Sequence, residues 1–332
     1  MLIVPYYSVI GGWVIKYLVE YFRGNAKLLA EDGYFTDFIS NGVSTELCFV
    51  AFCAFTLIII FAGVQNGIER VSKIMMPILI VLSVIIAVYS VTRPGALAGV
   101  KYFLVPNVKN FSWMTVVSAM GQMFYSLSIA MGILITFGSY MKKDTAIEDS
   151  TRNVEIFDTG IAIMAGLMII PAVFAFSGGD PGTLQAGPSL MFITIPKVFQ
   201  NMGFGTVIGI VFFLLVLFAA VTSSIALTES AVSTFEDELG WGRKKATVLV
   251  GVIMLALGSL SSLGYGPLAG IKIIGMQFLD LFDFLTNSVM MPIAALLTSL
   301  FVSRVVGIDK IEEEIIHGES AFRRKKVFVV MI

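Results

Sequence analysis

Residues 206–234 read TVIGIVFFLLVLFAAVTSSIALTESAVST, and this stretch decides the class of fold. A helix needs about 20 mainly apolar residues to cross a bilayer, and the stretch exceeds that length with Glu229 as its one ionisable residue. The apolar run is interrupted by the hydroxyl-bearing residues 222–224. The stretch therefore predicts a transmembrane helix that carries a polar patch at membrane depth.

The composition of the whole chain agrees with a membrane protein. Of the 332 residues, 57% are hydrophobic and 14% are charged, whereas soluble domains have roughly 45–50% and about 25%. These values exclude an ordinary soluble enzyme and a disordered chain. A net charge of −1 leaves no basic surface for nucleic acid. Two cysteines, Cys48 and Cys53, and one histidine, His317, give neither a disulfide framework nor a histidine-based metal site.

The same length criterion predicts eight membrane spans in one transmembrane domain over residues 1–332. They cover residues 2–22, 46–64, 74–92, 115–139, 156–178, 206–234, 246–264 and 277–303. A further apolar segment starts at 327–332, and residues 1–4 open inside an apolar run without the features of a signal peptide. We therefore expect a polytopic all-α protein that is truncated at both ends.

The loop charges predict the orientation of the spans. Most Lys and Arg residues lie in the loops after the second, fourth, sixth and eighth spans, and the run 323–326 adds strongly to this bias. Positively charged loops face the cytoplasm, so the first span runs from inside to outside. The long outer loop 179–205 contains an amphipathic segment, 189–201. Such a loop is compatible with a lid and with a spacer.

Polar residues inside three spans are candidates for a functional site, because polar groups at membrane depth are costly. Ser126 and Ser128 lie two residues apart, and both can face one ligand only where the helix is broken. The alternative is a regular helix whose serines bond to the preceding turn. The spacing alone favours the alternative.

A second cluster lies on one face of the sixth span. Ala219, Thr222, Ser223 and Leu227 follow helical spacing, and they offer two hydroxyls and a backbone carbonyl. Hard cations prefer such oxygen ligands. Small residues at this spacing are also typical of close helix packing in membranes, and the sequence does not distinguish the two.

Asp158 lies where the fifth span begins. A carboxylate just inside a span indicates a counter-charge for a cation or a proton. Aspartate is equally typical of a helix N-cap, so both interpretations stand at this point.

Four stretches together resemble the neurotransmitter:sodium symporter family, in its bacterial amino-acid transporter branch. PYYSVIGGW (5–13) is similar to its third helix, and NGIERVSKIMMP (66–77) to its loop between helices four and five. GQMFYSLS (121–128) is similar to its broken sixth helix. TSSI (222–225) with FEDEL (235–239) is similar to its eighth helix and the end of that helix. The resemblance implies an inverted-repeat sodium symporter fold, here lacking the first two helices and most of the eleventh.

The resemblance also implies roles for individual residues. The substrate would be bound by Tyr7, Tyr125, Ser126, Ser128, Met131, Ser223 and Leu227. Two sodium sites would use Ser126 and Asp158, and Ala219, Thr222 and Ser223. Asp283 would belong to the extracellular gate, and the loop 179–205 would be the extracellular lid. Asp158 replaces an asparagine of the family, and its charge implies that no chloride is required.

The implied function is sodium-coupled symport of a small neutral, hydrophobic amino acid by alternating access, in a multi-pass protein of the plasma membrane. The alternatives are a non-transporting fragment or incomplete gene product of such a symporter, and a different sodium-coupled solute carrier of the same fold. A membrane enzyme is disfavoured, because no His, Cys or paired-acid constellation lies at one depth.

Overall fold

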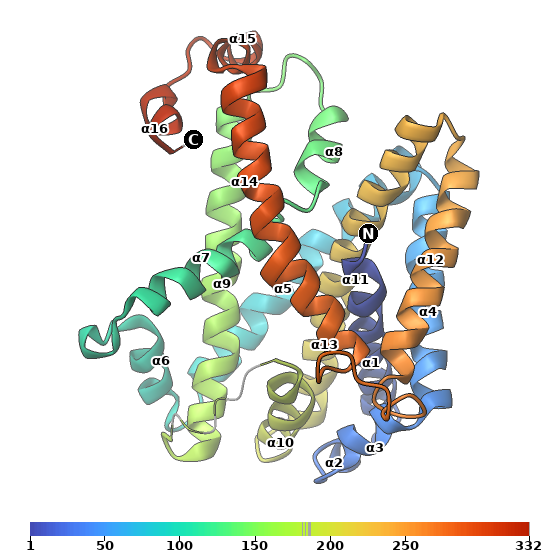
Figure 1. The fold of residues 1–332 in the computed structure, drawn as a ribbon. Helices are drawn as coiled ribbons and strands as arrows, with labels where there is room; N and C mark the ends of the chain where they lie inside the picture. Colours follow the sequence, from blue (N-terminus) through green and yellow to red (C-terminus); the bar gives the residue numbers. More distant parts are fainter. Residues whose placement is uncertain (181, 183, 185–186, 332) are drawn as a thin grey trace. The chain divides into compact units, whose positions relative to one another are not determined.

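The computed structural model describes residues 1–180, 182, 184 and 187–331. Across these residues the chain is helical, and no strand forms among them beyond an isolated bridge between Ile273 and Met276 (Figure 1). The all-α fold class predicted from the sequence is confirmed.

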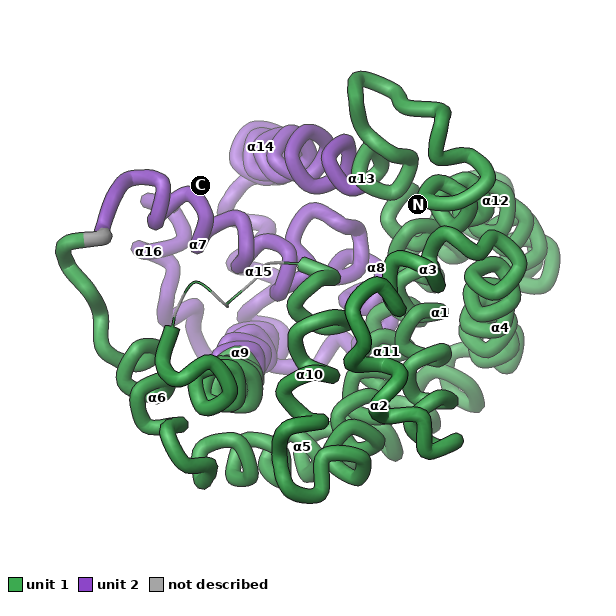
Figure 2. Tube along the Cα trace, turned by 90° about the horizontal axis from the view of Figure 1, so that it is seen from below, with its two compact units in different colours: residues 1–109, 161–282 green, residues 110–160, 283–332 purple. Residues whose placement is uncertain are grey.

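The chain divides into two compact units, which are described separately (Figure 2). The first unit comprises Met1–Lys109 and Ile161–Phe282, and the second comprises Asn110–Gly160 and Asp283–Ile332. The long helix α9 (Ile147–Ser177) contributes its first part to the second unit and the rest to the first. A single domain over residues 1–332 stays a prediction.

The core of the first unit is a group of four long helices. α1 (Ile3–Phe22) packs against α4 (Gly42–Phe61), α11 (Gly205–Leu239) and α12 (Arg243–Leu263). Gly12 makes the α1–α4 contact close, because a Cβ atom there would lie 2.7 Å from the backbone nitrogen of Phe49. Small residues that let helix backbones touch are the usual means of helix association in membranes.

One more long helix, α5 (Arg70–Val91), and several shorter elements belong to the first unit. The shorter elements are α2 (Ala26–Leu29), α3 (Tyr34–Ser40), the π-helical turn η1 (Val64–Glu69), α6 (Ala96–Leu104), η2 (Val108–Asn110), η4 (Leu190–Thr194), α10 (Ile195–Gln200) and α13 (Phe278–Asp283). η2 and α13 extend by one residue into the second unit. η4 and α10 lie in the predicted lid loop, of which residues 181, 183, 185 and 186 fall outside the described part.

An aromatic cluster fixes the loop helices η4 and α10 to the first unit. The hydroxyl of Tyr17 on α1 donates to the carbonyl of Phe192 over 2.7 Å. The Phe192 ring stacks on Phe35 at 5.2 Å and meets the edge of Trp13 at 5.7 Å. Phe192 is buried, as is Phe213 of α11, which stacks on Tyr17. Buried aromatic pairs of this geometry add about 0.5–1.5 kcal/mol each beyond their burial.

The second unit contains a broken helix. α7 (Trp113–Ser126) and α8 (Ile133–Ser139) are separated by the unwound residues 127–132. Ser128 and Ala130 have φ angles of 56° and 62°, a left-handed conformation that residues other than glycine rarely adopt. The span placed at 115–139 is therefore two helices with a break, as the family resemblance implies.

The rest of the second unit is a run of helices near the C-terminus of the chain. They are η5 (Phe284–Met290), α14 (Met291–Phe301), η6 (Val302–Val306), α15 (Ile308–Gly318) and α16 (Lys325–Met331). Glu319, the residue after α15, caps the start of α9, and Glu148 of α9 caps the residues that precede α16. Glu319 accepts from the backbone nitrogen of Glu148 over 2.6 Å, and Glu148 accepts from the backbone nitrogens of Arg323 and Arg324 over 2.9 and 2.8 Å. Unpaired N–H groups at helix starts are thereby satisfied.

Six helical segments within the described residues are long and apolar enough to cross a membrane. They are Gly42–Phe61, Val64–Val91, Ile147–Ser177, Gly205–Leu239, Arg243–Leu263 and Phe278–Val306. The other two predicted spans correspond to α1 and to the interrupted pair α7–α8, which are not among the six.

Candidate sodium and substrate sites

Ser126 and Asp158 meet at the helix break of the second unit. Ser126 is the last residue of α7, and its hydroxyl donates to Oδ1 of Asp158 on α9. This hydrogen bond differs from the alternative prediction, in which the Ser126 hydroxyl bonds to the preceding turn. α9 begins at Ile147, so Asp158 lies about three turns inside the helix and the N-cap interpretation is wrong. A hydroxyl and a carboxylate therefore face each other beside unwound backbone.

The second oxygen cluster lies in the middle of α11, in the first unit. The hydroxyl of Thr222 lies 3.0 Å from the carbonyl oxygen of Ala219, to which it donates. Ser223 is exposed, whereas the adjacent Ser224 is buried and meets the hydroxyl of Thr56 on α4 at 3.2 Å. The helix therefore turns Ser224 into the packed core and leaves the Ala219, Thr222 and Ser223 oxygens on a less buried face.

Tyr7 on α1 joins this cluster. Its hydroxyl shares a hydrogen bond with the side chain of Ser223 on α11. Tyr7 is half-buried, and Leu227 lies buried one turn beyond Ser223. Two residues that the resemblance assigns to substrate binding are thus in contact, although 216 positions separate them in the chain.

Each unit holds one part of the predicted residue set. The first unit carries Tyr7, Ala219, Thr222, Ser223 and Leu227. The second unit carries Tyr125, Ser126, Ser128, Met131, Asp158 and Asp283.

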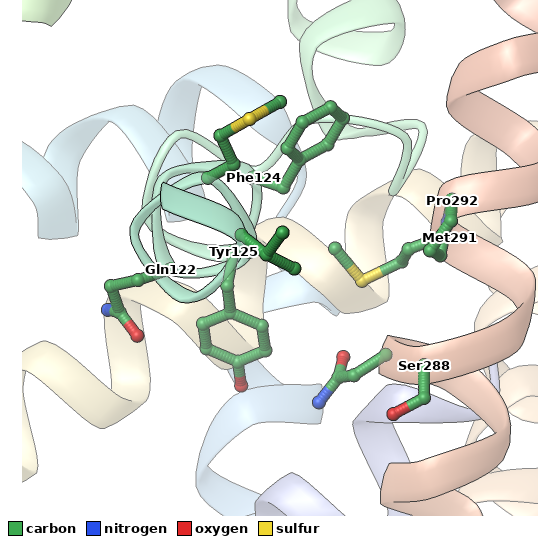
Figure 3. A pocket seen from close by; sticks show the side chains of 10 residues that line it. Gln122, Phe124, Tyr125, Ser288, Met291 and Pro292 are labelled. Carbon is green, nitrogen blue, oxygen red and sulfur yellow. The ribbon is translucent and has the colours of Figure 1, made fainter. Parts of the chain in front are cut away.

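A cavity of about 660 Å³ lies within the second unit. Gln122 and Tyr125 of α7 line one side of it, and Ser288, Met291 and Pro292 line the other (Figure 3). Most of the lining is apolar, with a few polar groups, as is typical of small-molecule pockets. Tyr125, the residue expected to close over the substrate, is part of this lining.

Asn287 and Gln122 line the cavity and are absent from the predicted site. The Asn287 amide donates to Oδ1 of Asp283 over 2.6 Å and so orients the predicted gate carboxylate. A signal for this pair existed in the sequence, because residues four apart share a helix face. The sequence shows Gln122 as a polar residue in the fourth span. Only the structure shows that it lines the cavity.

The donor atoms in both clusters suit a small alkali cation. They are hydroxyl, backbone carbonyl and carboxylate oxygens, which are ligands of hard cations. In the part of the chain that the structure describes, no group of three or more His, Cys, Asp or Glu side chains gathers.

Comparison with known proteins places the chain in a family. The model of the sodium:neurotransmitter symporter family matches residues 19–332. The uncharacterized sodium-dependent transporter YhdH of Bacillus subtilis is 36% identical over 323 residues, which cover 96% of this chain and 71% of that protein. An uncharacterized sodium-dependent transporter of Haemophilus influenzae is 32% identical over 314 residues, covering 92% of this chain and 67% of that protein.

A solved structure shows the same fold. MhsT, crystallised in complex with L-phenylalanine, aligns with a TM-score of 0.85 and 35% sequence identity. The alignment covers 99% of this chain and 74% of that chain. The chain belongs to the sodium:neurotransmitter symporter family, a family of sodium-dependent membrane transporters and not of enzymes.

Proposed function

We propose that the protein carries out sodium-coupled symport of a neutral, hydrophobic amino acid across the plasma membrane by alternating access. The observation that carries the proposal is the contact between Ser126 and Asp158 beside the unwound residues 127–132. Broken helices expose backbone groups and side-chain oxygens to ions and substrates in transporters of this kind.

Two sodium ions would be bound as co-transported substrates. Ser126 and Asp158 contribute to the first site. The carbonyl of Ala219 and the hydroxyls of Thr222 and Ser223 contribute to the second site. Inward movement of each sodium ion releases roughly 2.3 kcal/mol per 100 mV of membrane potential, in addition to its concentration gradient. This energy drives accumulation of the amino acid.

No chloride ion is needed beside the first sodium ion in this proposal. The Asp158 carboxylate already meets Ser126 at the helix break, and its charge balances the charge of the cation. An opposite charge within contact distance stabilises the ionised carboxylate.

The amino acid would be bound by a mixture of polar and apolar side chains. Tyr7, already in contact with Ser223, would donate its hydroxyl to the substrate carboxylate. Tyr125 would cover the substrate, and Ser126, Ser128, Met131 and Leu227 would surround it. Met131 and Leu227 are apolar and favour a hydrophobic side chain, and the flexible methionine adapts to different shapes. MhsT, the related solved transporter, was crystallised with L-phenylalanine.

Access from outside would be controlled by two features. Asp283, oriented by Asn287, would form the acidic half of the extracellular gate. The loop 179–205 would act as the lid, with η4 and α10 as its structured part. Closure would exclude water before the inner side opens, so that ion and substrate cross together.

Uptake into proteoliposomes tests this function. We expect the protein to accumulate labelled L-phenylalanine and other hydrophobic amino acids under an inward sodium gradient, and not under a potassium gradient. Labelled glutamate and lysine serve as charged comparisons. Equal uptake with and without sodium would contradict the coupling. Sodium-driven uptake of charged amino acids alone would contradict the substrate class.

A further inference from the structure

A second cavity of about 360 Å³ lies in the first unit, at the end of α5. Its walls come from the segment after α5, from the end of α9 and from the turn between α10 and α11. The lining residues are Arg93, Pro94, Ala175, Phe176, Asn201, Met202 and Gly203. None of the predicted sodium or substrate residues lines this cavity, although residues 201–203 belong to the end of the proposed lid loop 179–205.

Arg93 is held in position by Tyr89. Its Nε donates to the Tyr89 carbonyl over 3.2 Å, and its guanidinium lies 4.3 Å from the centre of the Tyr89 ring. The Tyr89 hydroxyl in turn donates to the carbonyl of Gly203 across the cavity wall. Stacking on an aromatic face orients the planar guanidinium while its terminal nitrogens stay available as donors.

The charge of the cavity wall is positive. Arg93 forms no ion pair with a carboxylate of the described residues, and the lining contains no Asp or Glu. The 35-residue helix α11 begins at Gly205, just after the lining residue Gly203, and a helix start carries a partial positive charge. Asn201 adds an amide side chain. These features favour an anion, and a half-buried guanidinium is well suited to phosphate oxygens.

In the turns of α5 that precede Arg93, the helix presents an apolar face that is substantially exposed. Ile78, Val81, Ile85 and Val88 lie on one side of the helix with exposed fractions of 38%, 56%, 47% and 58%. They lie within the membrane-crossing segment Val64–Val91, whose Arg93 end is predicted to face outside. This apolar face ends near the cation of Arg93 and the ring of Tyr89. Its apolar part matches the acyl chains of a phospholipid, and its charged end matches the phosphate group.

We propose that this cavity binds the phosphate group of an outer-leaflet phospholipid, with Arg93 as the phosphate ligand and the exposed face of α5 as the contact for an acyl chain. The site rests on the geometry of the first unit, so it does not depend on the transported substrate. Phosphate diesters accept two parallel hydrogen bonds from arginine, which a lysine ammonium does not reproduce.

Native mass spectrometry of the purified protein tests this site. The detergent-solubilised protein is titrated with phosphatidylglycerol, and the fraction with one bound lipid gives the dissociation constant. We expect Arg93→Gln to weaken binding about tenfold or more, because a charge-assisted hydrogen bond is lost. Lys101→Gln, which removes an exposed cation from α6, is the matched control and should leave binding unchanged. Arg93→Lys should restore part of the affinity.

Two probes separate the sources of the phosphate. Diacylglycerol has the acyl chains without phosphate, and sn-glycerol 3-phosphate has the phosphate without chains. The proposal requires that neither competes effectively with phosphatidylglycerol. It is overturned if Arg93→Gln binds as the unmodified protein does, or if it and Lys101→Gln weaken binding equally. Competition by glycerol phosphate at the affinity of the lipid would assign the cavity to a free anion and overturn the lipid assignment.

Discussion

In the proposed first sodium site, Asp158 would supply the negative charge that balances the cation. It contacts Ser126 at the break, where the family pattern has a neutral asparagine. We expect Asp158→Asn to raise the sodium concentration needed for half-maximal uptake by about tenfold or more, since one charge-assisted contact contributes roughly 1.5–3 kcal/mol. Uptake by the variant should become stimulated by chloride.

The measurement is amino-acid uptake against sodium concentration, in chloride and in gluconate. Asp144→Asn, which neutralises an exposed carboxylate outside the site, should behave as the unmodified protein does. Unchanged sodium dependence in Asp158→Asn would remove Asp158 from the sodium site.

Tyr7 gives a second test at the level of one atom. Tyr7→Phe keeps the ring and removes the hydroxyl that contacts Ser223. We expect the apparent affinity for the amino acid to fall about tenfold, because one hydrogen bond to a charged carboxylate is lost. Sodium dependence should change less. Tyr102→Phe, which alters an exposed tyrosine on α6, is the control in the same uptake assay. An equal effect of both substitutions would contradict the carboxylate role of Tyr7.

At the level of helices, Glu229 connects three elements of the first unit. Its carboxylate is fully buried and accepts from Arg243 over 2.9 and 2.5 Å, and Nε of Arg243 donates to the carbonyl of Ile60 over 3.1 Å. The pair therefore ties α11 to α12 and α4. In the sequence, Glu229 is the one ionisable residue of the stretch 206–234, and nothing there indicates that Arg243 folds back onto α11.

Removing one partner of this pair should destabilise the protein. We expect Arg243→Gln to lower the free energy of unfolding by about 3–5 kcal/mol, since a buried carboxylate loses its counter-charge. The double substitution Arg243→Met with Glu229→Leu should cost much less, because no unpaired charge remains. Thermal unfolding in detergent compares the variants. Equal losses in the single and double variants would show that the charge pairing is not the cause.

One exposed ion pair on the lid segment depends on pH. The Lys197 ammonium on α10 hydrogen-bonds to Asp32 and lowers the pKa of that carboxyl below its ordinary value. An ion pair that lowers the pKa of a carboxyl stabilises the folded state fully at pH values above the ordinary pKa near 4. This stabilisation is lost as the pH falls through the lower pKa of the folded state. We therefore expect the ion pair to restrain the C-terminal end of α10 at neutral pH and to release that end in acid, while the buried Val198 and Phe199 keep the helix packed.

A spin label at Gln200 reports this mobility by electron paramagnetic resonance. The unmodified protein should show faster label motion only below about pH 4, near the ordinary aspartate pKa. Asp32→Asn should show that motion already at neutral pH. A label that moves at the same rate in both proteins at neutral pH would contradict the tether.

At the level of the whole molecule, hydrophobic length alone predicted the helical class and the position of most spans. The physical reason is that each apolar run must be buried in lipid with its backbone bonds satisfied internally. α9 begins at Ile147, earlier than the apolar run starts at 156, because its first turns are charged and are capped by Glu319. That capping depends on a contact 171 positions away, which periodicity does not reveal.

The candidate site was predictable only in part. The break at 127–132 and the pairing of Ser126 with Asp158 came from resemblance to a family, since the spacing of the serines favoured an unbroken helix. The π-helical turn at Phe284–Met290 and the cavity beside it had no sequence signal. The cavity lies between segments of the second unit that are far apart in the chain. The sequence therefore predicts the residues that carry the chemistry of the site better than the residues that line its cavity.

Simultaneous flux of sodium and the amino acid tests whether the two are co-transported. Proteoliposomes containing the protein are given radioactive sodium with L-phenylalanine, with glutamate or with no amino acid. We expect L-phenylalanine to accelerate sodium entry and glutamate to leave it unchanged. We also expect Ser126→Ala to abolish the acceleration. Sodium entry that is the same under all three conditions would contradict coupled symport.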